Sequence, residues 1–142
     1  MKRIYKIKTK MTSRVCEIKG INNDFFSPDE LKSIIKSNIS YGLGNDKYII
    51  VTNVKNKIIG IEQVHDSADA ITTAIKANAA GIVTVITLPY CTTLKESYER
   101  RKDIPCFSFH NDILKMCELF QIDWVDTIAL DSNLNCVAFK EV

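Results

Sequence analysis

A chain of 142 residues with 46% hydrophobic and 25% charged residues has the composition of one globular domain. These proportions exclude a disordered polyelectrolyte, a collagen-like repeat and a disulfide-stapled miniprotein, and the chain is long enough to bury a core. The formal net charge is +2, but residues 1–20 carry seven basic side chains and one acid, which leaves residues 21–142 at −4. The sequence therefore predicts a basic N-terminal arm over residues 1–20 and a mildly acidic domain over residues 21–142.

Cysteine usage and hydropathy indicate the cellular compartment. The five cysteines form no C-x-x-C pair, which favours reduced thiols. The first residues alternate charged and apolar side chains, so they lack the continuous apolar core of a signal peptide. No run of about 18 apolar residues occurs that could cross a bilayer. We therefore expect a cytoplasmic protein with no membrane partner.

The first half of the chain alternates between strand and helix signals. Apolar and lysine side chains alternate from Tyr5 to Met11, as in a half-exposed strand. Ser27-Pro28-Asp29-Glu30 combines a capping box with a proline at the first helical position. The predicted elements are a strand over 5–11, a segment over 15–18 that pairs with it or continues the arm, a helix over 28–38, a loop over 40–45 and a hairpin of strands at 48–52 and 57–64.

The second half contains the most strongly apolar segment. Residues 82–88 are β-branched and apolar without alternation, which predicts a central strand buried on both faces and ended by Pro89. The predicted elements are a helix from 66 or 67 to 79 that Gly81 ends, the strand 82–88, a polar surface excursion over 90–105, a helix capped by Ser108 over 108–120, and strands over 122–130 and 136–139 around a turn at 131–133. This order predicts an α/β fold with a mixed β-sheet and flanking helices.

The residues alone leave two kinds of candidate site open. Cys91 could act as a nucleophile with His110 and Asp112, or it could pack near a loop while His110 lies on a solvated helix face. With only His65 and His110 in the chain, and no zinc-ligand spacing, no metal site is expected. The basic arm could contact nucleic-acid phosphates, or it could be an edge strand that lysines protect from aggregation. Its candidate contact residues are Lys2, Arg3, Lys6, Lys8 and Lys10.

Six segments share their order and residue pattern with one known domain. They are Ser27–Leu31, Asn53–Gly60, Val64–Ser67, Lys76–Val85, Phe120–Leu130 and Ala138–Glu141. Over roughly residues 20–141 the chain resembles the JAB (MPN) domain of the bacterial RadC family of DNA-repair-related proteins. The resemblance implies a cytidine-deaminase-like architecture. The chain before residue 20 is too short for the helix-hairpin-helix segment that precedes this domain in the family.

The resemblance also implies that the catalytic apparatus of the family is lost. The two zinc-binding histidines of the family fall on Ile86 and Leu88, which have no lone pair to offer a metal. The third ligand has its nearest counterpart at Asp112, and the catalytic glutamate falls on Asn45 or Asp46. A chain with these substitutions is expected to bind no metal and to need no cofactor.

Three functions follow as expectations. The first is a catalytically silent JAB domain that acts as an interaction or scaffold module, with a partner protein bound near Leu88, Tyr90 and Cys91 in the groove of the former active site. The second is a divergent JAB-type metallopeptidase or hydrolase with a rebuilt site. The third is a nucleic-acid accessory protein that uses the lysine-rich arm. The sequence predicts neither the partner's identity nor the oligomeric state.

Overall fold

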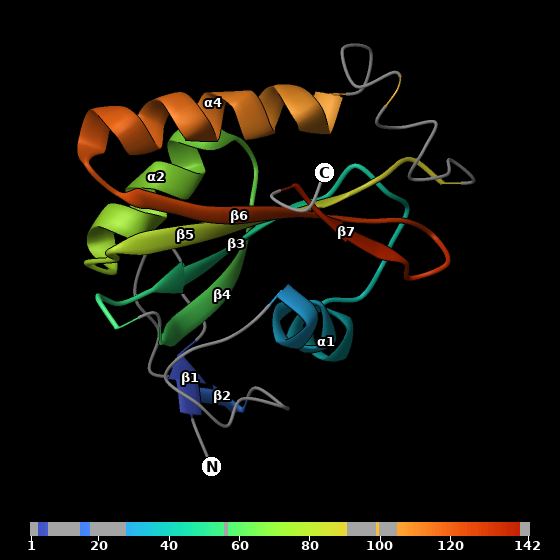
Figure 1. The fold of residues 1–142 in the computed structure, drawn as a ribbon, viewed down its shortest axis with the longest axis horizontal. Helices are drawn as coiled ribbons and strands as arrows, with labels where there is room; N and C mark the ends of the chain where they lie inside the picture. The colour runs from blue at the N-terminus through green and yellow to red at the C-terminus, as the bar shows by residue number, and fades with distance from the viewer. Residues whose placement is uncertain are drawn as a thin grey trace.

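A computed structural model of the chain describes residues 3–5, 15–17, 28–55, 57–90, 99 and 105–139. Within them the fold is α/β, as predicted, with a five-stranded mixed sheet of order β4-β3-β5-β6-β7 and helices on both of its faces (Figure 1). The strands of this sheet are β3 (Lys47–Thr52), β4 (Ile58–Val64), β5 (Gly81–Thr87), β6 (Asp123–Leu130) and β7 (Cys136–Ala138).

Strand β5 lies at the centre of the sheet. It pairs antiparallel with β3 and parallel with β6, while β3–β4 and β6–β7 are antiparallel pairs. All seven of its residues are buried. The prediction of a central strand buried on both faces is confirmed, because an unbroken apolar run is what such a position requires.

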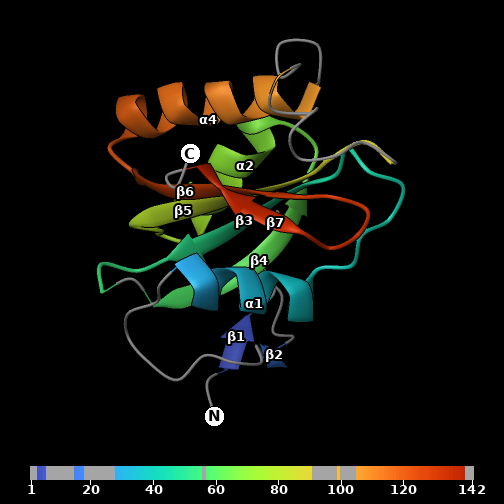
Figure 2. The same ribbon diagram turned by 45° about the vertical axis from the view of Figure 1, so that its right-hand side comes forward.

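The helices divide the core into two layers. Helices α2 (Ser67–Lys76) and α4 (Pro105–Phe120) cover one face of the sheet, and α1 (Pro28–Asn38) covers the other (Figures 1 and 2). Side chains of β5 alternate between the two layers, with Ile82 and Ile86 in the core below α2 and α4, and Val83 and Val85 in the core beside α1. The α1 boundaries agree with the prediction.

The N-terminal arm begins with a short hairpin. Strands β1 (Arg3–Tyr5) and β2 (Val15–Glu17) pair antiparallel, and β1 contacts the edge strand β4 (Figure 2). Of the two alternatives for residues 15–18, the structure shows pairing for residues 15–17, with a strand that begins at Arg3 rather than at Tyr5. The rest of the predicted strand, residues 6–11, lies outside the described residues.

Helix α2 ends at Lys76, three residues earlier than predicted. The chain leaves the helix at Asn78, whose φ of 55° is left-handed, and the Ala79 amide donates to the Ala74 carbonyl. This is how a helix commonly closes its last turn. Gly81 does not end the helix. It opens β5, where a Cβ would lie 2.6 Å from Thr52 Oγ1.

Helix α4 begins at Pro105, three residues before the predicted cap at Ser108. Proline is favoured at the first helical position because its missing N–H would have no helical partner there. The predicted turn after β6 is confirmed, since Asp131 Oδ1 accepts from the amides of Asn133 and Asn135 at 2.9 Å each. Among the described helices, none has the length and hydropathy needed to cross a membrane.

Candidate functional site

The candidate site lies where β5 ends. Ile86 and Leu88 are both fully buried, with 0% of their surface exposed. They belong to the same core cluster as Phe107, Phe109 and Ile113 of α4. The two positions that the resemblance assigns to metal-binding histidines are thus occupied by aliphatic side chains in the packed layer below α4.

Asp46, which with Asn45 is one of the two predicted counterparts of the catalytic base, lies toward the opposite layer. Its Oδ1 is 3.4 Å from Gln63 Nε2, and Gln63 is the cross-strand partner of Tyr48. Tyr48 packs against the α1 core, and burial together with the charge of Asp46 raises its pKa. The carboxylate of Asp46 therefore does not share a face with Ile86.

Lys47 takes the position on the Ile86 face. It pairs with Ile86 across β3 and β5, its Nζ donates to the His65 carbonyl at 3.3 Å, and the same atom lies 6.0 Å from the centre of the Phe109 ring. An ammonium group donates hydrogen bonds but has no lone pair. The ammonium group of this cross-strand neighbour of Ile86 therefore offers a metal no ligand, and its positive charge would repel a cation.

The loop between α1 and β3 is fastened to the end of β5. The Asn45 amide donates to the Thr87 carbonyl at 2.8 Å, and the Thr87 amide donates to the Asp46 carbonyl at 2.9 Å. The Asp46 amide also donates to Thr87 Oγ1 at 2.8 Å, and the Tyr41 hydroxyl donates to the Leu88 carbonyl. These bonds hold the loop in one conformation against the strand.

Gly44 makes this close approach possible. Its φ is +90°, and an added Cβ would lie 2.6 Å from the Leu88 carbonyl oxygen and 3.1 Å from Pro89 Cα. Any other residue would be strained in this conformation and would collide with the backbone. The loop thereby presents Leu43, whose side chain is 92% exposed, and Tyr90 beyond Pro89 is 70% exposed.

The predicted binding residues Leu88, Tyr90 and Cys91 therefore divide between core and surface. Leu88 is buried, Tyr90 is exposed, and Cys91 lies outside the described residues. Leu43 was not predicted, although the glycines on either side of it are a signal that the backbone there has unusual requirements.

His110 is buried, so its expected position on a solvated helix face is wrong. It is 9% exposed, its Nδ1 lies 2.7 Å from Thr127 Oγ1, and the Trp124 indole N–H donates to the same oxygen at 2.8 Å. Its ring meets the rings of Trp124 and Phe139 edge-on. Burial lowers the pKa of His110 to about 4, so the imidazole is neutral at physiological pH.

The nucleophilic arrangement is not assembled within the described residues. Asp112 is exposed on α4, two positions from the buried His110, and Cys91 lies outside the described part of the chain. Of the other thiols, burial raises the pKa of Cys117 to about 11, and burial also raises the pKa of Cys136. A protonated thiol is a poor nucleophile, so both are suited to packing.

Metal-ligating side chains do not gather in the described residues, where no three His, Cys, Asp or Glu side chains lie close enough to hold an ion.

Of the predicted nucleic-acid residues, Arg3 lies in β1, while Lys2, Lys6, Lys8 and Lys10 lie outside the described residues. No protein-family model matches the chain, and no curated protein matches it.

Proposed function

We propose that this protein is a catalytically silent, RadC-like JAB domain that serves as a protein-interaction module. The observation that supports it is the complete burial of Ile86 and Leu88 in the core below α4. These are the positions at which the resemblance expects two imidazoles, so their packing replaces a ligand site with hydrophobic contacts.

The chemistry of the family requires a different set of groups. A catalytic zinc needs three protein ligands and an open position for water, and a nearby carboxylate must take the water's proton. Here the donor set does not fit zinc, because two positions are aliphatic, Lys47 shares their face, and the Asp46 carboxylate lies toward the other layer. Burial of a leucine instead contributes about 1.5–3 kcal/mol to stability.

An interaction role is supported by the apolar side chain that is exposed at the end of β5. The α1–β3 loop is held by five hydrogen bonds to Thr87 and Leu88 and carries the exposed apolar side chain of Leu43. A surface fixed in this way loses little conformational entropy when a partner binds. The fold is then a rigid support for recognition, and the former catalytic layer is part of its core.

The test is metal content and hydrolysis measured on one preparation. Purified protein dialysed against buffer with a trace of zinc should retain less than about 0.1 zinc per chain by elemental mass spectrometry, because aliphatic side chains donate no lone pair. It should leave a mixed peptide library uncleaved. The variants Cys91→Ala and His110→Ala serve as controls. Stoichiometric zinc that either variant loses, together with cleavage, would establish a rebuilt peptidase and overturn the proposal.

A further inference from the structure

We propose that the β1–β2 hairpin is a removable cover for the open edge of β4, and that a second copy of this chain pairs with that edge when the hairpin is displaced. An uncovered strand edge joins other strands through its backbone N–H and C=O groups. Such regulated association goes beyond the proposed interaction role and does not require it.

The two edges of the five-stranded sheet differ in their protection. At one edge β7 has three residues, and the part of β6 beyond it, Asp123–Thr127, contains two aspartates and a shift of register against β5. Short strands, charges and bulges are features that keep an edge from pairing with other chains. At the other edge β4 has seven residues, three of them isoleucines, with no proline, lysine or arginine, and its register with β3 is regular from Gly60 to Val64. The β4 edge therefore depends on a cover from elsewhere in the chain.

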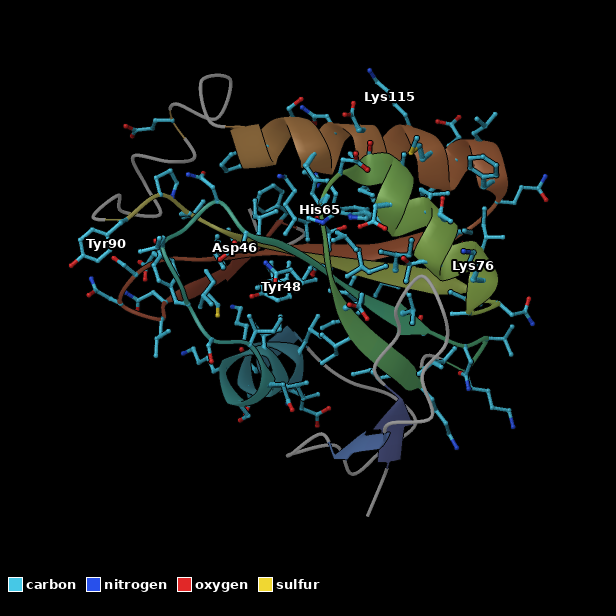
Figure 3. The ribbon with its side chains drawn as sticks, turned by 180° about the vertical axis from the view of Figure 1, so that it is seen from behind. Asp46, Tyr48, His65, Lys76, Tyr90 and Lys115 are labelled. Carbon is cyan, nitrogen blue, oxygen red and sulfur yellow. The ribbon has the colours of Figure 1, made fainter. Side chains whose placement is uncertain are left out.

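The hairpin supplies this cover. Within the described residues β1 contacts β4, yet it belongs to a separate two-stranded sheet with β2. Figures 1 and 3, drawn from opposite sides, both place the hairpin next to β4, at the end of the strand that is away from His65. The hairpin can therefore leave β4 without breaking a backbone ladder of the five-stranded sheet.

Symmetry and charge favour a second copy as the strand that takes its place. Two β4 strands that pair antiparallel about Ile61 form an interface in which both copies contribute the same residues. Glu62 is the only carboxylate in β4, and this register places it opposite Gly60 of the other copy, so no like charges face each other. The second strand would run along the beginning of β4, where the hairpin lies, so the two occupants exclude each other.

The test measures self-association of the full chain by sedimentation equilibrium. Ile4 and Cys16 form the central one of three residue pairs in the hairpin, so Ile4→Pro combined with Cys16→Pro removes its ladder. The dimer of this double variant should have a dissociation constant at least about tenfold lower than that of the unmodified chain. The single variant Val15→Pro disturbs only the pair with Tyr5 and should give an intermediate constant.

Two further substitutions in the double variant locate the interface. Gln63→Lys should restore the monomer, because Gln63 is exposed on β4 and an edge lysine opposes strand pairing. Leu119→Lys is the matched control, since it adds the same charge at a 74% exposed position of α4, and it should change the dissociation constant by less than about twofold. Proline variants that associate no more than the unmodified chain, or a dimer that persists in Gln63→Lys or dissociates in Leu119→Lys, would overturn the inference.

Discussion

At the scale of single residues, the clearest feature is a histidine that the fold keeps neutral. His110 lies between α4 and β6, where Thr127 Oγ1 meets its Nδ1 and two aromatic rings surround it. A buried imidazole is more costly to protonate than one in water, and this lowers its pKa to about 4. Its surroundings are those of a packing residue.

This shift predicts a specific dependence of stability on pH. The pKa of His110 is about 4 in the folded chain and about 6.5 unfolded, so between these values the unfolded chain binds more protons. The stabilising contribution is complete above pH 6.5, as the unfolded pKa requires, and falls by up to about 3 kcal/mol as the pH approaches 4. Urea unfolding at intervals between pH 7.5 and 4.5 measures it.

Two variants isolate the contribution of this one side chain. His110→Gln should flatten the pH dependence in that range, because glutamine does not titrate. His65→Gln is the matched control, since it removes the other histidine of the chain at an exposed position before α2. Equal slopes for His110→Gln and the unmodified chain would contradict the assignment.

At the scale of elements, the sequence predicts well which segments form helices and which form strands. It predicts less well the residues at which they begin and end. Pro28 and its acidic neighbours mark the start of α1 because capping is local chemistry. The predicted end of α2 and the predicted start of α4 are each three residues off, because two local signals compete at each place: Asn78 with Gly81, and Pro105 with Ser108. Gly81 is a plausible helix terminator by sequence, but its small size is needed where β5 passes Thr52, a contact that only the tertiary structure creates.

The end of α2 gives a test at this scale. Asn78 holds a left-handed φ of 55°, which glycine adopts without cost and alanine does not. Asn78→Ala should lower the free energy of unfolding by about 1 kcal/mol, whereas Asn78→Gly should change it by less than about 0.5 kcal/mol. Urea denaturation of both variants measures the difference. A loss no larger for alanine than for glycine would show that Asn78 does not hold a left-handed conformation after α2.

At the scale of the whole molecule, one sheet joins two cores. The layer below α2 and α4 contains Ile86 and Leu88, and the layer beside α1 contains Val83 and Val85. The burial of β5, which contributes to both layers, could be predicted from its composition. The attachment of the α1–β3 loop to the end of β5 could not be predicted, because it depends on hydrogen bonds between segments more than forty residues apart.

The close packing of the layer below α2 and α4 predicts a large loss of stability when Leu88 is truncated. Leu88→Ala should lower the free energy of unfolding by about 2–5 kcal/mol, because it removes buried methyl groups and leaves a cavity. Leu119→Ala is the matched control, since Leu119 on α4 is 74% exposed, and it should cost less than about 0.5 kcal/mol. Thermal and urea unfolding measure both variants. A loss below about 1 kcal/mol for Leu88→Ala would mean that the side chain borders open space.

The parallel pairing of β5 with β6 affects how this protein is made. About 35 residues separate the end of one strand from the start of the next, so a ribosome releases Gly81–Thr87 well before Asp123–Leu130. During that interval the nascent chain carries an apolar strand with one unpaired edge, which is the kind of segment that associates with other chains. The edge of β5 that β6 covers is therefore open to association with other chains until residues 123–130 have been synthesised.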